Sequence, residues 1–363
     1  MATYYVTTAG SDTNSGTEAN PFLTISKGWD TAGNGDTIIV NDSGTYTVVE
    51  GGANQLTTGP GKLKTSLTIK AGDGCSPVFD GGGSATYCMK MWNTWTVEGL
   101  TFRNFDCPLT NAVLHQYYSH NAAIIRDCTF HDITGMAVNI QKTGTVIERC
   151  IAYNVNGYGV FHAGLGNDNV IKHCLIYNCK SRAAYAAAGS VLHCTIYNAP
   201  SLENNGQSDV QYRLTSTYAE VTRYNVIANC NVRQYANAGD YTSYNCVSGS
   251  VDHVHGNTVT NYMNDITGTG DLDGDDPQFA NAAGNDYTLL GTSPCIAACA
   301  TSTHTDSLIG ASTRTWEYSQ LIFGITAAIG GSNRHPDMGC YENGSMILGA
   351  RTALINKVMG AAG

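Results

Sequence analysis

The sequence predicts an all-β fold, a parallel β-helix in which short strands wind about one axis, and three observations lead to this prediction. A phrase with Cys at its fourth position occurs four times, at residues 125–132, 147–154, 171–178 and 191–198. Each copy alternates apolar and polar residues and is rich in Ile, Thr and Tyr, which is typical of a strand with one buried face. The segments between the copies are rich in Gly and Asn and carry no helical pattern, so we expect each copy to belong to one coil of a solenoid.

Equivalent residues of successive coils should form ladders along the axis, because neighbouring parallel strands lie about 4.8 Å apart. The inward ladder is expected to comprise Leu100, Cys128, Cys150, Cys174, Cys194 and Asn225. The turn ladder, four residues later in each coil, is expected to comprise Asn104, Asp132, Asn154, Asn178, Asn198 and Asn229. Asn suits this position because it tolerates left-handed backbone angles and its amide can bond to the equivalent Asn of a neighbouring coil.

The composition fits one elongated, turn-rich β domain with a weakly charged surface. The 363 residues include 41 Gly, 21 Tyr and 13 Cys, and only 13% are charged. A formal net charge of −10 argues against nucleic acid or an anionic membrane as a partner, and no apolar run is long enough to span a membrane. We interpret the ladder cysteines as small buried apolar residues, in preference to disulfides or a metal site.

Both ends of the chain carry spaced motifs that are known from one superfamily. Near the N-terminus these motifs lie at residues 4–6, 10–17, 20–25, 35–40 and 44–46, and towards the C-terminus at residues 276–279, 286–289, 293–296 and 336–342. Together they resemble the N-terminal cap, first coil and closing segment of right-handed β-helix proteins of the pectate-lyase-like superfamily. The resemblance implies a right-handed, single-stranded parallel β-helix.

A short helix is expected to cap the open end of the solenoid. Ile25, Trp29 and Ala32 recur at helical spacing and would cover the first coil, whose edge would otherwise be exposed. Residues 50–64 and 105–122 are interpreted as loops inserted between coils. The predicted parts are an N-terminal cap at 1–36, a β-helix body at 37–300, an insertion with the closing segment at 301–342, and a C-terminal tail at 343–363.

Each coil also carries a second strand, and its outer face is the candidate ligand surface. Alternation places Val138, Val160, Ala184 and Val210 inward and Asn139, Phe161, Tyr185 and Gln211 outward in one row. Gln141 and Arg213 follow on the outer face, whereas His162 is expected in the core. Amides and aromatic rings supply the planar hydrogen-bonding groups and flat faces that bind sugars. The predicted glycan-binding residues are Asn139, Gln141, Phe161, Tyr185 and Gln211.

Catalytic residues are expected only as far as the resemblance implies them. The superfamily contains lyases, hydrolases, epimerases and non-catalytic virion spikes, so the fold alone assigns no activity. For a lyase the resemblance implies a Lys or Arg base, often with Ca²⁺ neutralising the carboxylate of the substrate. Lys142 or Arg213 is then the candidate base, and Tyr185 is a candidate acid.

The densest acids of the chain suggest a calcium site or a structural turn. Asp271, Asp273 and Asp275 have the spacing of a calcium loop. The sixth position is Asp276 in place of Gly and the twelfth is Ala282 in place of Glu. A structural turn before the closing motif is therefore favoured, with bound Ca²⁺ as the alternative and no other cofactor expected.

Two functional hypotheses follow. The first is a glycan-engaging surface or virion structural protein, of the phage tailspike, fibre or capsid-decoration type, which the acid-poor outer row and the apolar tail favour. The second is a polysaccharide lyase that cleaves a uronate-containing glycan by β-elimination. A glycoside hydrolase is disfavoured because the hydrolase signature of the superfamily is missing.

Partners and location follow from the first hypothesis. The expected partner is a polysaccharide or cell-surface glycan, with virion proteins and a homotrimer as further candidates. The chain enters a strand at its N-terminus without the pattern of a signal peptide, so either a leader has been removed or the protein leaves the cell by another route. We expect an extracellular or virion-surface location.

Overall fold

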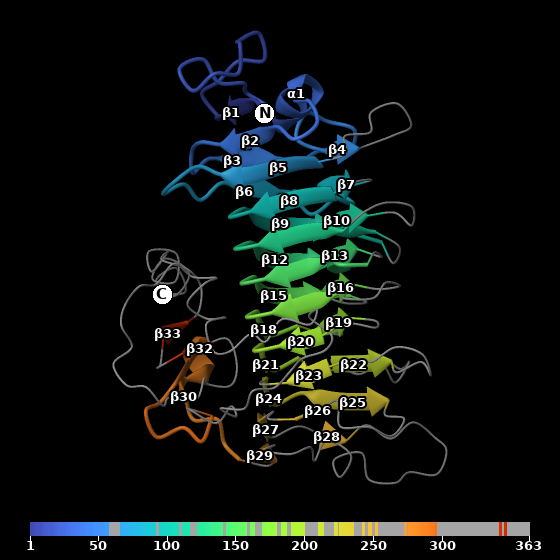
Figure 1. Ribbon diagram of the computed structural model, residues 1–363, viewed down its shortest axis with the longest axis vertical. Helices are drawn as coiled ribbons and strands as arrows, with labels where there is room; N and C mark the ends of the chain where they lie inside the picture. The colour runs from blue at the N-terminus through green and yellow to red at the C-terminus, as the bar shows by residue number, and fades with distance from the viewer. Residues whose placement is uncertain are drawn as a thin grey trace.

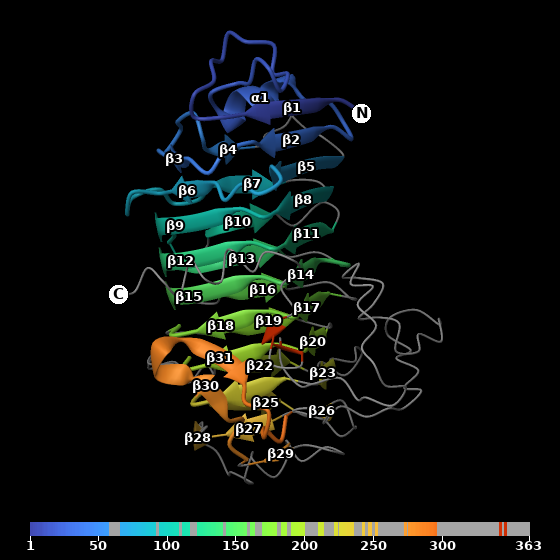
Figure 2. The ribbon, with the colours of Figure 1, turned by 90° about the vertical axis from the view of Figure 1, so that its left-hand side faces the viewer.

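The computed structural model winds short strands into a stack of coils along one axis (Figure 1). The structure describes residues 1–57, 66–91, 94–108, 111–116, 122–140, 143–157, 160–163, 169–179, 183–186, 190–199, 210–213, 221–223, 225–235, 242–243, 246–248, 251–252, 272–273, 275–295, 341–342 and 345–346. Within these residues the coils form three parallel sheets, here called sheets 1, 2 and 3 (Figure 2). The predicted all-β parallel β-helix is confirmed.

Each regular coil passes through the three sheets in the same order. Sheet 1 comprises β1 (Thr3–Val6), β2 (Thr37–Val40), β5 (Ser66–Ala71), β8 (Thr94–Glu98), β11 (Ala123–Arg126), β14 (Val146–Glu148), β17 (Val170–Lys172), β20 (Ser190–Leu192), β23 (Val221–Arg223) and β26 (Thr242–Ser243). Sheet 2 comprises β3 (Thr45–Thr47), β6 (Val78–Asp80), β9 (Thr101–Asp106), β12 (Thr129–Thr134), β15 (Ile151–Asn156), β18 (Leu175–Tyr177), β21 (Thr195–Tyr197), β24 (Val226–Ala228), β27 (Cys246–Ser248) and β29 (Leu272–Asp273). Sheet 3 comprises β4 (Leu56–Thr57), β7 (Met89–Met91), β10 (Ala112–Gln116), β13 (Met136–Ile140), β16 (Phe161–Ala163), β19 (Ala184–Ala186), β22 (Val210–Arg213), β25 (Asn231–Tyr235) and β28 (Val251–Asp252).

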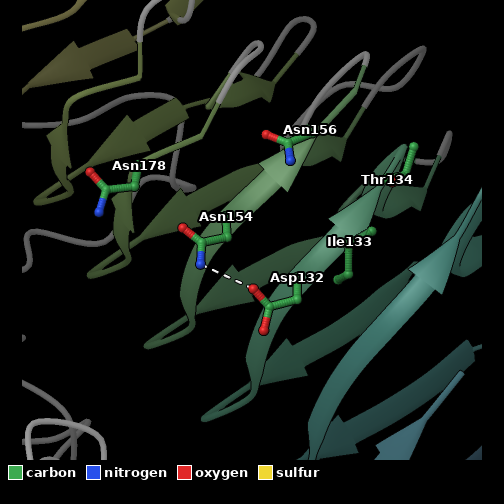
Figure 3. Close-up of a pocket in the computed structure, with 6 residues that line it drawn as sticks. All are labelled: Asp132, Ile133, Thr134, Asn154, Asn156 and Asn178. Atoms are coloured by element: carbon green, nitrogen blue, oxygen red, sulfur yellow. Dashed lines mark hydrogen bonds between the residues drawn. The ribbon is translucent and has the colours of Figure 1, made fainter. Parts of the chain in front are cut away.

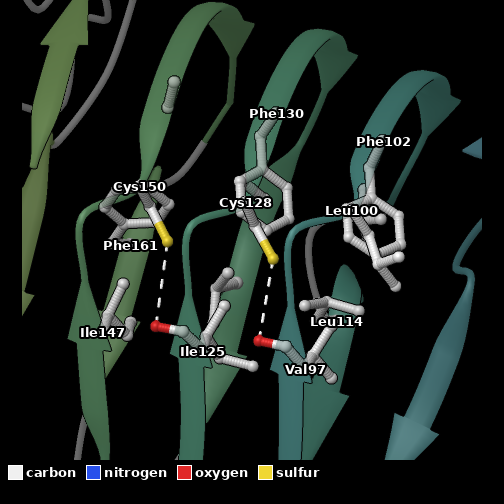
Figure 4. Close-up of a cluster of buried hydrophobic side chains, with 14 of the residues drawn as sticks. Val97, Leu100, Phe102, Leu114, Ile125, Cys128, Phe130, Ile147, Cys150 and Phe161 are labelled. Carbon is white, nitrogen blue, oxygen red and sulfur yellow. Dashed lines mark hydrogen bonds between the residues drawn. The ribbon is translucent and has the colours of Figure 1, made fainter. Parts of the chain in front are cut away.

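The inward ladder lies in the core as predicted. Leu100, Cys128, Cys150, Cys174, Cys194 and Asn225 are each at most 1% exposed. Figure 4 shows Cys128 and Cys150 pointing between aromatic and aliphatic side chains of adjacent coils. The Cys128 thiol lies 3.7 Å from the carbonyl oxygen of Val97, and the Cys150 thiol 3.8 Å from that of Ile125, both one coil back. Cysteine, a small apolar side chain with a weak S–H donor, therefore fits this inward position of the coil.

The ladder cysteines are thiols, and their reactivity should report the packing of the coils. Burial raises the pKa of the Cys128, Cys150 and Cys174 thiols well above the ordinary value, and a buried thiol is inert. We expect a bulky maleimide to label these residues only after unfolding, whereas half-buried Cys75 should react in the native protein. Mass spectrometry of labelled peptides checks the order, and rapid native labelling of Cys150 would contradict the inward register.

The turn ladder also has the predicted conformation. Its members Asn104, Asp132, Asn154, Asn178, Asn198 and Asn229 all have left-handed φ angles, between 47° and 55°. Side-chain amides join neighbouring coils, with Nδ2 of Asn198 2.7 Å from Oδ1 of Asn178. Asn is favoured here because it accepts this backbone conformation and can pair with the next coil.

A column of aromatic rings fills the core between the sheets. Tyr46, Phe79, Phe102, Phe130 and Phe161 follow one another along the axis, and the last four are fully buried. Ring centroids of consecutive members lie 5.3, 5.6, 5.2 and 5.8 Å apart. These distances suit offset stacking and edge-to-face packing, so each coil is fixed against the next by shape as well as by hydrogen bonds.

The predicted capping helix closes the first coil. α1 (Ile25–Thr31) begins after Thr24, whose side chain accepts a hydrogen bond from the backbone N–H of Lys27. Ile25 and Trp29 of the helix are buried, and the Trp29 ring lies 4.7 Å from that of Trp95. The apolar face of the helix therefore extends the core at the end of the stack.

The C-terminal part of the described chain turns back along the stack. A hairpin is formed by β30 (Phe279–Asn281), the 3-10 turn η2 (Ala282–Gly284) and β31 (Asp286–Leu289), and two short strands follow, β32 (Tyr341–Glu342) and β33 (Ser345–Met346). The predicted insertion and tail otherwise lie outside the described residues, and the predicted domain limits stay predictions. No helix in the described part of the chain is long and apolar enough to cross a membrane.

Candidate functional site

The outer row predicted on sheet 3 is shifted by one residue in one coil. Backbone pairing aligns Asn139 with His162 and His162 with Tyr185. Phe161 is fully buried, and its ring packs edge-on against Phe130 in the core. The prediction that Phe161 is an exposed glycan ligand is therefore wrong, and the backbone of His162 occupies the outer position.

In the coils of β13 and β16, two consecutive inward residues where the chain enters sheet 3 explain the shift. Val160 and Phe161 are both fully buried, as are Ala137 and Val138 in the preceding coil. The first residue of each pair lies where the chain turns from sheet 2 into sheet 3, and strict alternation does not hold at such a corner. Val160 is thus equivalent to Ala137 and not, as the alternation suggests, to Val138.

Asn139 lies on the outer row but is covered. Its side chain is 4% exposed, and that of His115, its pairing neighbour on β10, is 5% exposed. The prediction of Asn139 as an accessible glycan ligand is wrong, because a side chain buried to this extent offers no surface to a polymer. The interpretation of residues 105–122 as an inserted loop is also wrong at β10, which is a regular strand of sheet 3.

The other predicted ligands and catalytic residues are placed only in part. Gln141 and Lys142 lie outside the described residues. Tyr185 lies in β19, and Gln211 and Arg213 lie in the neighbouring strand β22, where the structure describes only the backbone. The strands thus bring Tyr185 and Gln211 to adjacent coils, and the roles of all five residues stay predictions.

The acids proposed for calcium are likewise untested. Asp271 lies outside the described residues, Asp273 has only its backbone described in β29, and Asp275 is exposed. Among the side chains that the structure describes, no three His, Cys, Asp or Glu gather as a metal ion would require. The calcium site and the structural turn stay alternatives.

A polar hollow on sheet 2 is the candidate site. It has a volume of about 470 Å³ and is open to solvent. Its lining residues come from three successive coils and are Asp132, Ile133, Thr134, Asn154, Asn156 and Asn178. The left-handed residues of the turn ladder bend each strand, so that Asp132 and Asn154 lie at one side and Thr134 and Asn156 at the other (Figure 3).

The carboxylate of Asp132 is the charged group of the hollow. One oxygen lies 2.8 Å from Nδ1 of His131, and the other accepts a hydrogen bond of 3.0 Å from Nδ2 of Asn154. Partial burial alone would raise the pKa of Asp132, but these hydrogen bonds and the charge of Arg103 lower it below its ordinary value. Asp132 is therefore ionised at neutral pH and acts only as an acceptor.

The Asp132 carboxylate should make the stability of the protein depend on pH in the acid range. A carboxyl whose pKa is lowered on folding stabilises the native state above the unfolded value of about 3.9, and this contribution is lost as pH falls through the lower native value. We expect the difference in unfolding free energy between wild type and Asp132→Asn to be constant above about pH 5 and to shrink below about pH 4. Urea titrations across this range measure it, and a difference that grows on acidification would contradict the assignment.

A second charged pair flanks the hollow one coil towards the N-terminus. Nε of Arg103 lies 2.7 Å from Oδ2 of Asp80, and Asn104 donates to the same carboxylate. Arg103 pairs in register with His131 on the next strand. The guanidinium of Arg103 thus faces the carboxylate of Asp80, and the ring of His131 faces that of Asp132.

The C-terminal hairpin contacts sheet 2 at the other end of the hollow, beside Asn178. Tyr287 of β31 is fully buried, with its ring centroid 5.1 Å from that of Tyr177 and 5.0 Å from that of Tyr197 on sheet 2. Asn285 accepts a hydrogen bond of 3.3 Å from Nδ2 of Asn178, which lines the hollow. The hairpin lies against the outer side of sheet 2 (Figures 1 and 2).

The sequence did contain a signal for this docked hairpin. The residue before each Asn of the repeated phrase is Tyr153, Tyr177 or Tyr197, and these rings line up on the outer face of sheet 2. Tyr153 stacks on Tyr177 at 5.1 Å and on His131 at 4.8 Å. A repeated aromatic residue on an outer face indicates that something covers that face.

Comparisons with known proteins agree with this architecture. A family model described as "Pel9A-like, right handed beta helix region" matches residues 4–179, and one described as "Right handed beta helix region" matches residues 111–281. The solved structure of pectate lyase Pel9A is 12% identical with a TM-score of 0.51, covering 94% of this chain and 96% of that one. The molecule is therefore a right-handed parallel β-helix. In this architecture it is similar to the pectate-lyase-like right-handed β-helix proteins.

Two further solved structures match the chain with lower TM-scores. A rhamnogalacturonan lyase is 16% identical with a TM-score of 0.41 over 70% of this chain and 74% of that one. XylC in complex with xylose is 13% identical with a TM-score of 0.41 over 68% and 67% of the two chains. No curated protein sequence matches the chain. At these identities the likeness to solved structures is one of fold.

Proposed function

We propose that this protein is a glycan-engaging surface or virion structural protein that holds a polysaccharide chain in the hollow on sheet 2. The observation that carries the proposal is the hollow itself, in which polar side chains recur coil after coil on an open surface. A polysaccharide repeats its hydroxyl groups along its length, and carboxylate and amide groups bind hydroxyls directionally. The volume of about 470 Å³ falls within the usual range for ligand pockets.

The arrangement also favours binding because the lining is rigid before a ligand arrives. Asp132 and Asn154 are held by their mutual hydrogen bond, and their strands are held on both sides by parallel pairing. Thr134 and Asn156 are exposed at the opposite side of the hollow and make no side-chain hydrogen bond within the described residues. A preorganised set of groups loses little conformational entropy on binding.

The fold serves many activities, so the support for this function comes from the polar groups of the hollow. The alternative of β-elimination on a uronate-containing glycan rests on the likeness to a pectate lyase, which is one of fold. The proposed partner is a polysaccharide, and an extracellular or virion-surface location with virion partners belongs to the same proposal.

Binding to a panel of immobilised neutral and acidic polysaccharides tests the function. We expect the wild type to bind at least one member, and the double variant Thr134→Ala/Asn156→Ala to bind it more weakly. Each lost hydrogen bond contributes about 1 kcal/mol, which corresponds to about fivefold in Kd. Asn20→Ala, an exposed Asn in the N-terminal cap, is the matched control and should bind like the wild type.

Two outcomes of this experiment would replace the proposal. If the wild type binds no polysaccharide, or the double variant binds as well as the wild type, the hollow is not a glycan site. If incubation with an acidic polysaccharide produces the ultraviolet absorbance of an unsaturated uronate, the protein is a lyase and the alternative holds.

A further inference from the structure

The amide ladder on sheet 2 is interrupted beside the hollow. The other described amides of the ladder donate towards the N-terminal end of the stack, as Asn154 does to Asp132 at 3.0 Å and Asn198 does to Asn178 at 2.7 Å. The same pattern would have Asn178 donate to Asn154. Nδ2 of Asn178 instead donates to Oδ1 of Asn285, 107 residues further along the chain.

The docked hairpin supplies the acceptor that interrupts the ladder. Asn285 has a left-handed φ of 61° at the end of η2, which places its side chain over sheet 2. Its Oδ1 also accepts a hydrogen bond of 3.2 Å from the hydroxyl of Tyr287, whose ring is fully buried against Tyr177 and Tyr197. The position of Asn285 is therefore fixed by the packing of Tyr287.

The interruption leaves an acceptor of Asn154 facing the hollow. The ionised carboxylate of Asp132 can only accept, so the amide nitrogen of Asn154 must face Asp132 and Oδ1 must face the other way. Within the part of the chain that the structure describes, this Oδ1 accepts no hydrogen bond. Figure 3 shows the Asn154 nitrogen directed at Asp132.

We propose that this interruption makes the hollow a hydrogen-bond-accepting site for the hydroxyl groups of an uncharged sugar unit. This inference rests on the proposed glycan function. Oδ1 of Asn154 and the carboxylate of Asp132 are the paired acceptors, and Asn285 is the positioning residue that keeps Asn154 available. Sugar hydroxyls donate to such acceptors, whereas the carboxylate of an acidic sugar would meet the charge of Asp132. Arg103, the nearby guanidinium, faces the carboxylate of Asp80 and leaves this preference in place.

Pairs of glycans that share a backbone and differ in charge test the ligand class. The probes are dextran against dextran sulfate, cello-oligosaccharides against carboxymethyl-cellulose, and methyl-esterified against free polygalacturonate. In each pair that the wild type binds, we expect the uncharged member to bind more tightly than the charged one, by about tenfold or more in Kd. Preference for the charged member would overturn the inference and leave the glycan function standing.

Two glycine variants test the residues. Asn285→Gly keeps the left-handed conformation, removes the competing acceptor and lets Asn178 donate to Asn154, and Asn154→Gly removes the acceptor itself. We expect each to weaken binding of the uncharged probe by about fivefold to tenfold. Asn229→Gly is the matched control, because Asn229 belongs to the same ladder with a φ of 53° but does not line the hollow.

The outcomes separate the two proposals. A wild type that binds none of the probes overturns the glycan function and this inference with it. A wild type that binds, together with an Asn285→Gly variant of unchanged affinity and unchanged thermal stability, overturns the role of the interruption alone. Tyr287→Phe, which loses only the hydroxyl bond to Asn285, should bind nearly as well as the wild type.

Discussion

Replacing Phe102 by Ala is expected to lower the free energy of unfolding by about 3–5 kcal/mol, the range for a buried Phe truncated in a core. Phe102 is fully buried in the aromatic column, with ring centroids 5.6 Å from Phe79 and 5.2 Å from Phe130. The cavity left by the ring cannot close easily, because hydrogen-bonded pairing fixes β9 between β6 and β12. The penalty therefore includes both lost burial and an unfilled cavity.

Chemical denaturation followed by fluorescence and circular dichroism measures this loss. Both probes are needed because neighbouring coils of a solenoid can unfold separately. Val49→Ala, at a side chain that is 58% exposed, is the control and should change stability by no more than about 0.5 kcal/mol. A loss below about 1 kcal/mol for Phe102→Ala would show that the column is not tightly packed.

The coil and its two ladders were predictable because the sequence repeats them. Cys128, Cys150 and Cys174 occur in the same phrase, so their inward direction follows from one alternation that is confirmed several times. The Asn position was equally predictable, since a left-handed turn and a neighbouring amide both favour Asn. Repetition averages out local exceptions, and the fold class follows from it.

The left-handed residue immediately before each ladder cysteine was not predictable from residue type. Asp127, Arg149 and His173 occupy it with φ near 53°, although Arg has no intrinsic preference for this conformation. Arg149 is held there by two hydrogen bonds to Asp127, at 2.9 and 2.8 Å, and by an ion pair with Glu148 at 3.1 Å. Contacts between coils override propensity at this turn.

The candidate site was only partly predictable, for two physical reasons. The outer row on sheet 3 was misassigned because Val160 lies at a corner, where two consecutive side chains point inward. The hollow on sheet 2 ends near Asn178, whose hydrogen bond to Asn285 joins residues 107 apart in sequence. Such a contact has no periodic signal, so only the unexplained outer tyrosines pointed towards it.

Replacing Tyr287 by Ala is expected to release the C-terminal hairpin from sheet 2. The ring is fully buried between Tyr177, Tyr197 and Phe279, so its removal should weaken docking by about 3–5 kcal/mol. The pairing of sheet 2 does not pass through the hairpin, whose strands pair only with each other. The loss should therefore appear as local opening, with the unfolding of the stack itself little changed.

Hydrogen exchange and limited proteolysis of residues 279–289 measure this opening directly. Leu290→Ala, next to β31 at a side chain that is 46% exposed, is the matched control and should leave protection unchanged. Release of the hairpin also frees Asn178 to donate to Asn154, so Tyr287→Ala should lose affinity for the uncharged sugar while Leu290→Ala keeps it. Retained protection of the hairpin in Tyr287→Ala would mean that contacts other than this ring hold the hairpin in place. The packing of Tyr287 would then not be what fixes the position of Asn285.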